Sequence, residues 1–269
     1  MTPDVYDCLV DWGNREFKNI AKERKNTRNF PIAFNGIGDF GEELSGYLYP
    51  ETIGSGSKGG CSHDNRIIDP VTRNTTFARE VKTVSLNGSK KCSDCKNKAP
   101  AFQLSCTFCK GSNFTIIKDS RAGISAKDHI EYKDVLKETI IFVIDFNEKD
   151  EIINLKCFKF LNDNDYFCRY VHNQHVNSKQ NTCNFIPYSY DWHLSGPIQL
   201  FDINIQSTGT LDVKKFDLSN DEPCDIPRRV FKPVEIDTHQ ILDEYIKYRD
   251  NFPLRVKTLN KKRGITTRK

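Results

Sequence analysis

Apolar residues recur at helical spacing in two segments near the N-terminus. Within Val5–Lys25 they lie three to five positions apart, which predicts a helix over that range. A second helix is expected over Gly38–Tyr49, where Phe40, Leu44 and Leu48 fall on one face. The chain is therefore expected to open with two amphipathic helices.

The middle of the chain has the pattern of strands around one further helix. Two strands are expected over Cys61–Ile68 and Phe77–Leu86, joined by a turn-rich connection. A helix is expected over Ala126–Glu138. The nearly continuous apolar run Thr139–Phe146 is typical of a strand buried on both faces, and another strand follows in Glu151–Leu161.

The C-terminal half contains shorter apolar segments, such as Gly196–Ile205, and a last helix is expected over Thr238–Arg249. Strands flanked by helices predict one α/β domain over residues 1–269, with a central mixed β-sheet and helices around it. No apolar run reaches the roughly 18 residues that span a bilayer, and the N-terminus shows no secretory signal pattern. We therefore expect a soluble, cytoplasmic protein without membrane contact.

Basic residues gather in two places, although the formal net charge of the chain is only +4. The tail Arg255–Lys269 holds seven basic residues and no acidic one, and the stretch Lys82–Lys118 holds seven lysines against the single acid Asp94. Local basic surfaces on a nearly neutral body suit contact with a phosphate backbone. The alternative is an ordinary solvated face and a solubilising tail, and charge alone leaves both open.

Four cysteines form the strongest local pattern in the chain. The CxxC pairs Cys92/Cys95 and Cys106/Cys109 are separated by ten residues within the segment 90–112. Each pair can chelate one ion, and four thiolates complete a closed tetrahedral zinc site with no position left for a catalytic water. The sequence therefore predicts a small zinc-knuckle insertion with a structural Zn²⁺, rather than disulfides, which are rare inside cells.

A second group of ligand-type residues is Cys168, His172, His175 and Cys183. Its spacing matches no common metal site closely. Buried cysteines and hydrogen-bonded histidines explain the group equally well, so a second metal site stays open.

Acidic residues and a lysine indicate a different site just before the cysteines. Glu80 and Lys82 lie two positions apart in an expected strand, so their side chains fall on the same face. Asp64 lies in the preceding expected strand, and a hairpin would bring the three side chains together. Two carboxylates at one point can bind Mg²⁺, and a lysine beside them can orient or help deprotonate a metal-bound water.

This arrangement resembles the PD-(D/E)xK nuclease superfamily, which includes many type II restriction endonucleases. The resemblance covers Gly38–Lys82, where a helix, a strand with an aspartate and an ExK strand follow one another. It implies a restriction-endonuclease-like core that hydrolyses phosphodiester bonds of DNA. By this resemblance Asp64 and Glu80 are Mg²⁺ ligands, and Lys82 orients or activates the attacking water.

The same resemblance implies an additional helix carboxylate, supplied by Glu42 or Glu43. The sequence departs from the family pattern because His63, not proline, precedes Asp64. Asp69, which belongs to an inverted Asp-Pro pair, is therefore a rival for the first metal ligand.

An enzyme of this kind is expected to bind double-stranded DNA as a homodimer and to work beside a cognate DNA methyltransferase in a prokaryotic cytoplasm. Candidate DNA contacts are Arg121, Lys90, Lys91 and Ser125. Arginine commonly reads guanine and lysine binds phosphate. Ser125 is equally well placed to cap the helix that follows it.

Two other functions stay open. A ββα-metal nuclease would also combine a four-cysteine zinc site with a catalytic histidine, and His129, His172 and His175 are its candidates. None of them follows a hairpin that leads into a helix, as that fold requires. A non-catalytic zinc-ribbon DNA-binding protein would need no carboxylate pair, so metal-dependent cleavage separates it from both nucleases.

Overall fold

The computed structural model describes residues 1–26, 34, 36–54, 64–86, 89–100, 106, 108–116, 121–147, 150–164, 166–167, 170–171, 182–185, 192 and 194–224. The expected helix 238–249 and the basic tail 255–269 lie outside these residues. So do Cys168, His172 and His175 of the second ligand-type group. The predictions made for these segments therefore stay predictions.

The helices in the described part of the chain are α1 (Pro3–Asn26), α2 (Ile37–Leu48) and α3 (Ala126–Glu131). The first two agree closely with the helices expected over Val5–Lys25 and Gly38–Tyr49. None of the described helices combines the length and the hydropathy that a membrane span requires.

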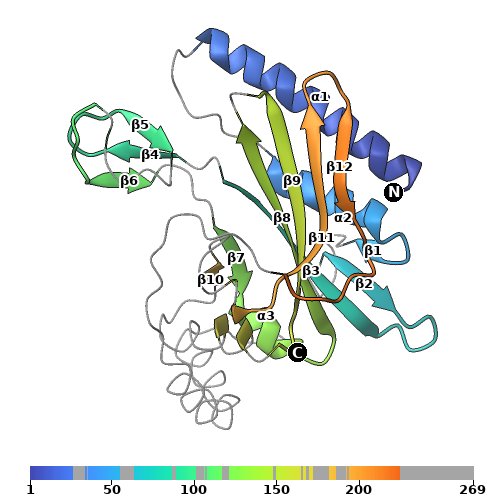
Figure 1. The fold of residues 1–269 in the computed structure, drawn as a ribbon. Helices are drawn as coiled ribbons and strands as arrows, with labels where there is room; N and C mark the ends of the chain where they lie inside the picture. Colours follow the sequence, from blue (N-terminus) through green and yellow to red (C-terminus); the bar gives the residue numbers. More distant parts are fainter. Residues whose placement is uncertain are drawn as a thin grey trace.

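A large mixed sheet forms the centre of the fold (Figure 1). Its strand order is β1-β2-β3-β8-β9-β11-β12. Strands β3 and β8 run parallel, and every other neighbouring pair is antiparallel. The strands are β1 (Ile53–Gly54), β2 (Asn65–Ile68), β3 (Thr75–Ser85), β8 (Leu136–Asn147), β9 (Ile152–Leu161), β11 (Ile198–Gln206) and β12 (Leu211–Phe216). The α/β class with a central mixed sheet is therefore confirmed.

Strand β8 is buried on both faces, as its apolar run predicts. Ile140, Phe142 and Ile144 belong to the core on one face of the sheet, whereas Ile141 and Val143 belong to the core on the other. An alternating strand would leave one of these faces to solvent, so the continuous apolar run requires cover on both sides.

Helices α1 and α2 cover one face of the sheet (Figure 1). The rings of Trp12 on α1 and Phe40 on α2 stack with their centroids 4.0 Å apart, and Leu44 is fully buried beside them. The opposite face carries a second core that is rich in aromatic rings and is shared with β7, α3 and nearby segments. Its largest rings are those of Phe158, Phe160, Phe167, Phe185 and Trp192.

Two small sheets complete the described structure. Strands β7 (Ala122–Ser125) and β10 (Thr182–Phe185) form an antiparallel pair. Strands β4 (Ser89–Cys92), β5 (Lys98–Pro100) and β6 (Phe114–Ile116) form a three-stranded antiparallel sheet with β4 in the middle. We refer to Ser89–Ile116 as the ribbon, and it stands to one side of the large sheet (Figure 1).

The helix expected over Ala126–Glu138 is too long, since α3 ends at Glu131 and β8 begins at Leu136. The backbone amide of Ala78 donates to the carbonyl oxygen of Val135 at 2.7 Å, and Leu136 pairs with Ala78 in the parallel ladder. Pairing with β3 therefore uses backbone groups that a longer helix would need. Strand β7 occupies Ala122–Ser125, a segment for which the sequence pattern predicted no strand.

Candidate functional site

The β2–β3 hairpin places Asp64 beside Glu80. Asn65 pairs with Arg79 in this antiparallel ladder, so the same register places Asp64 opposite Glu80 on one face of the sheet. A side-chain oxygen of Asp64, Oδ2, accepts a hydrogen bond from the backbone amide of Val81 at 2.7 Å. This bond holds the Asp64 carboxylate against the strand that carries Glu80.

Lys82 completes what we call the acid–lysine cluster, which consists of Asp64, Glu80 and Lys82. The Nζ atom of Lys82 forms an ion pair with the Glu80 carboxylate. The side chain of Glu80 is 9% exposed and that of Lys82 is 28% exposed. The cluster is thus partly withdrawn from solvent, and its lysine still reaches the surface.

The charges of the cluster shift each other's pKa values. Burial and the neighbouring charge of Glu80 raise the pKa of Asp64 to about 6, although Lys82 and the Val81 amide act in the opposite direction. Burial alone would lower the pKa of Lys82, but the charges of Glu80, Asp64 and Glu42 outweigh it and raise that pKa. Lys82 is therefore an ammonium at neutral pH.

The structure distinguishes between Glu42 and Glu43, which the sequence leaves equivalent. The charge of Glu42 contributes to raising the pKa values of both Asp64 and Lys82, although other groups contribute more to each. Glu43 instead lines a cavity of about 280 Å³ between α1 and α2. There its charge adds to the effect of burial on Cys8, whose pKa rises to about 12.

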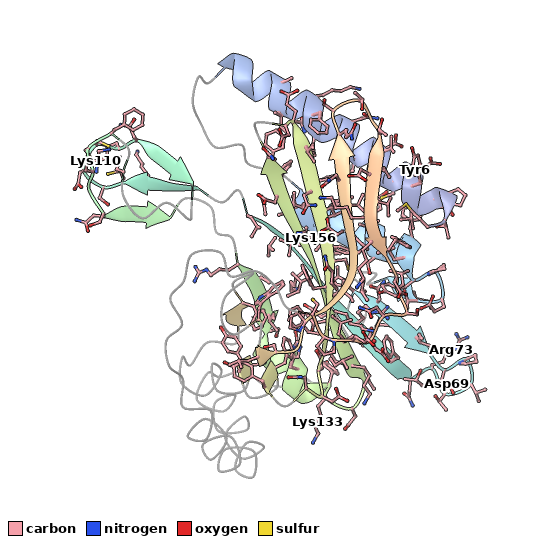
Figure 2. The ribbon with its side chains drawn as sticks, viewed as in Figure 1. Tyr6, Asp69, Arg73, Lys110, Lys133 and Lys156 are labelled. Carbon is pink, nitrogen blue, oxygen red and sulfur yellow. The ribbon has the colours of Figure 1, made fainter. Side chains whose placement is uncertain are left out.

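Asp69 lies in the turn between β2 and β3, at the far tip of the hairpin (Figure 2). Its Oδ1 atom accepts hydrogen bonds from the amides of Val71 and Thr72 at 2.8 and 2.6 Å. These bonds lower its pKa and describe a side chain that closes a turn. Asp64, and not Asp69, is the aspartate beside Glu80.

Helix α2 approaches the hairpin closely. A side chain at Gly41 would overlap the hydroxyl of Thr83 on β3, so the helix backbone rests directly on the sheet. Ser45 on α2 donates a hydrogen bond to the side-chain oxygen of Asn65, whose amide nitrogen donates to Thr52 at 3.0 Å. These buried contacts fix the start of β2, and with it Asp64, relative to α2.

A buried ion pair supports the opposite face of β3. The Nε and Nη2 atoms of Arg79 each lie 2.8 Å from one oxygen of Glu138 on β8. The Arg79 guanidinium also lies 3.6 Å from the ring centroid of Tyr49 and 5.0 Å from that of Phe77. Neither Arg79 nor Glu138 was among the site residues predicted from the sequence. The sequence contains one clue to this ion pair. Arg79 and Val81 lie two positions apart in the strand, so Arg79 falls on the same core-facing side as Val81, where a buried charge needs a partner.

The ribbon brings its four cysteine sulfurs together, as the spacing predicts. The sulfurs of Cys92 and Cys109 lie 3.5 Å apart, those of Cys95 and Cys106 lie 3.4 Å apart, and all four lie within 4.8 Å of one another. Zinc–sulfur bonds of about 2.3 Å in a tetrahedron require sulfurs about 3.8 Å apart. The donor set and its dimensions therefore fit a structural Zn²⁺.

The two CxxC turns have the same backbone hydrogen bonds. Within the first, the Lys96 amide donates to the Cys92 carbonyl at 3.0 Å, and within the second the Lys110 amide donates to the Cys106 carbonyl at 2.9 Å. The backbone and side-chain amides of Asn97 lower the pKa of Cys95 to about 6. The Gly111 amide acts to lower the pKa of Cys109, but hydrogen bonds with the other three sulfurs raise it to about 12. The sulfurs therefore share protons, which metal binding would release.

The remaining predicted DNA contacts lie in different surroundings. Lys91 is exposed on the ribbon, and Arg121 is exposed just before β7, whereas the side chain of Lys90 lies outside the described part of the structure. The hydroxyl of Ser125 accepts a hydrogen bond from the Asp128 amide at 3.2 Å and caps α3. The capping role of Ser125 is therefore the one that the structure shows.

His129 is the described candidate for the catalytic histidine of a ββα-metal nuclease. It is buried, its Nδ1 atom donates to the Ser125 carbonyl at 2.9 Å, and its Nε2 atom lies 3.2 Å from the Thr139 hydroxyl. Both ring nitrogens thus have partners inside the fold. Cys183, from the second ligand-type group, lies in β10, and its side chain is outside the described residues.

No protein-family model matches this chain, and no curated protein or solved structure matches it. The sites are therefore interpreted from their own residues. The described residues contain a four-cysteine cluster that can hold a metal such as zinc, and an acid–lysine cluster at the base of the β2–β3 hairpin.

Proposed function

We propose that this protein is a Mg²⁺-dependent endodeoxyribonuclease of the PD-(D/E)xK class that cuts double-stranded DNA at specific sequences, as a type II restriction endonuclease does. The observation that carries the proposal is the meeting of Asp64, Glu80 and Lys82 on one face of the β2–β3 hairpin. Fold alone does not imply function, and it is the residues of this site that support the proposal.

The order of the elements supports the proposal. Helix α2 comes first, Asp64 follows immediately before β2, and Glu80 and Lys82 come next on β3. This is the order of helix, aspartate strand and ExK strand that the resemblance to the superfamily leads us to expect. The negative charge of Glu42 on α2 also raises the pKa of Asp64, which is the effect expected of an additional helix carboxylate.

The carboxylates present a donor set that suits Mg²⁺. Asp64 and Glu80 offer oxygen ligands, which Mg²⁺ prefers, and the partial exposure of the cluster leaves room for the waters that this ion retains. A divalent cation would also relieve the repulsion that raises the pKa of Asp64. When bound, the ion would supply Lewis-acid stabilisation of negative charge on a phosphate.

Lys82 contributes a positive charge at a fixed place. Its raised pKa keeps it protonated, so its ammonium can hold a water molecule by a hydrogen bond or stabilise negative charge that develops on the phosphate. In this form Lys82 has no free electron pair with which to accept a proton. Its ion pair with Glu80 fixes its position before substrate arrives.

The expected partners follow from the proposed reaction. A sequence-specific cutter of double-stranded DNA is expected to act as a homodimer on two-fold symmetric sites and to be paired with a protecting DNA methyltransferase. Lys91 and Arg121 are exposed and are the proposed contacts to the phosphate backbone.

The test is cleavage of unmethylated phage DNA in the presence of Mg²⁺. The wild type is compared with Asp64→Asn, Glu80→Gln and Lys82→Ala. We expect discrete fragments from the wild type and a loss of at least roughly 100-fold in rate for each variant, because each removes a charge from the reacting site. Random degradation would instead indicate a nuclease without sequence specificity.

The chain offers matched controls for this test. Asp69→Asn alters the rival aspartate in the hairpin turn, and Glu43→Gln alters the neighbouring glutamate that faces α1. Both are expected to cut at the wild-type rate. If the wild type binds DNA and holds zinc but cuts none of several DNAs, the proposal is wrong and a zinc-ribbon DNA-binding protein is favoured.

A further inference from the structure

An exposed aromatic ring lies between the metal-binding cysteines of the ribbon. Phe108 is 66% exposed although it stands between Cys106 and Cys109. The turn that carries it is closed by two backbone hydrogen bonds, from the Cys106 amide to Gly111 at 2.8 Å and from the Lys110 amide to Cys106 at 2.9 Å. A single exposed apolar side chain is ordinary on a protein surface, so the ring is informative only together with the charges around it.

Lysines surround this end of the ribbon. Lys96 and Lys110 each follow the second cysteine of a CxxC pair, each has a φ of 62°, and both are exposed. They therefore leave the two turns at equivalent positions beside the sulfur cluster. Figure 2 shows Lys110 at the outer end of the ribbon, away from the large sheet. The left-handed conformation is unfavourable for a lysine, and the Nζ atom of Lys96 donates a hydrogen bond to the Ser93 carbonyl at 2.6 Å within its own turn.

The charges of the ribbon are almost all positive, and none of them belongs to an arginine. Between residues 89 and 116 the basic residues are all lysines and the single acid is Asp94, which contacts Gly111. Lysine contacts phosphate as a point charge, whereas paired recognition of guanine is usually made by arginine. The ribbon is therefore suited to a phosphate backbone without sequence preference.

We propose that the outer end of the ribbon binds unpaired DNA, with the Phe108 ring stacked on an exposed base and Lys96 and Lys110 beside the flanking phosphates. Aromatic stacking combined with a positive surface is the general mode of single-strand binding. A fully paired duplex hides the faces of its bases, so the ring selects for unpaired nucleotides.

This inference rests on the proposed function, to which it adds a second DNA-binding site that accepts an unpaired stretch next to the duplex. Strand β3 carries Glu80 and Lys82 and immediately precedes β4 of the ribbon in the order of elements. One DNA molecule that contacts both sites would have a duplex at the acid–lysine cluster and an unpaired segment at the ribbon.

The test measures the affinity of the full-length protein for a fluorescein-labelled oligothymidylate and for a blunt duplex, by fluorescence anisotropy in Mg²⁺-free buffer. Phe108→Ala is expected to weaken binding of the single strand by roughly 5-fold to 100-fold and to weaken duplex binding much less. Phe108→Tyr keeps an aromatic ring and is expected to restore the affinity. Tyr6→Ala is the matched control, because Tyr6 is 45% exposed on α1, far from the ribbon (Figure 2).

The lysines have a separate readout. Lys110→Ala is expected to reduce the slope of log affinity against log salt concentration by roughly one, since it removes one phosphate contact. Zinc content is measured for every variant, so that a collapsed ribbon is recognised. The inference is overturned if Phe108→Ala with its zinc intact binds the single strand like the wild type, or loses single strand and duplex equally. Because no cleavage is measured, a failure here is distinct from a failure of the proposed nuclease activity.

Discussion

Replacing Asp64 by asparagine should stabilise the metal-free protein at neutral pH, although it removes a proposed metal ligand. Asparagine resembles the protonated aspartate in shape and carries no charge. Its side-chain oxygen can still accept the hydrogen bond that Asp64 receives from the Val81 amide. The substitution therefore removes mainly the repulsion from Glu80 and the cost of burying a charge.

The size of the effect follows from the pKa of Asp64. Each unit of pKa difference is equivalent to about 1.4 kcal/mol, so a rise from 3.8 to about 6 corresponds to roughly 3 kcal/mol of lost stability when the group is ionised. Asp64 is only partly buried, and solvent screening reduces this figure. We therefore expect Asp64→Asn to raise the free energy of unfolding by about 1–3 kcal/mol at pH 7.5.

The pH dependence has a definite sign. Asp64 binds its proton more tightly in the folded protein than in the unfolded chain. The loss of stability caused by ionised Asp64 is therefore complete above pH 6 and disappears as the pH falls toward 3.8. The difference in unfolding free energy between Asp64→Asn and the wild type should fall to roughly half its full value at pH 5. Added Mg²⁺ should stabilise the wild type by mass action and should leave the variant unchanged.

Urea unfolding measures this effect through the fluorescence of Trp12 and Trp192, which are both buried. The buffer must contain no chelator, because a chelator would also compete with the four cysteines for a metal ion such as zinc. Asp69→Asn is the control: the pKa of Asp69 is lowered in the folded protein, so removing its charge should not stabilise. A destabilised Asp64→Asn protein at pH 7.5, or an advantage that does not change between pH 5 and pH 8, would refute the reasoning.

Three further predictions concern the surroundings of the sites. Gly41→Ala should destabilise by about 1–3 kcal/mol in urea unfolding, since the added carbon overlaps Thr83, whereas Gly46→Ala on the same helix meets no atom within 4 Å and should be neutral or slightly stabilising. Glu138→Gln should cost roughly 3 kcal/mol by the same measurement, because it leaves the buried Arg79 guanidinium without a counter-charge; equal stability of variant and wild type would contradict this. Cys106→Ser should abolish zinc binding and make the ribbon sensitive to proteolysis while the tryptophan fluorescence stays native, because the large sheet has its own core; unfolding of the whole chain would show that the two parts are coupled.

Local patterns in the sequence determined the parts of this protein that depend on one segment at a time. The helical spacing of apolar residues identified α1 and α2, and the continuous apolar run identified β8. The two CxxC pairs predicted a four-sulfur cluster because each turn forms locally. Strand alternation likewise placed Glu80 and Lys82 on the same face. These features follow from backbone geometry that repeats every two or 3.6 residues.

Only the tertiary structure decided between residues that are equivalent by pattern. Register in the β2–β3 hairpin places Asp64 opposite Glu80 and leaves Asp69 in the turn, and the packing of α2 turns Glu43 toward α1. The sequence pattern also predicted the end of α3 too late in the chain. Residues that are compatible with a helix instead form β8, where they pair with β3. Each of these outcomes depends on contacts between segments distant in sequence, and a residue's own neighbours in the chain carry no information about which distant strand will pair with it.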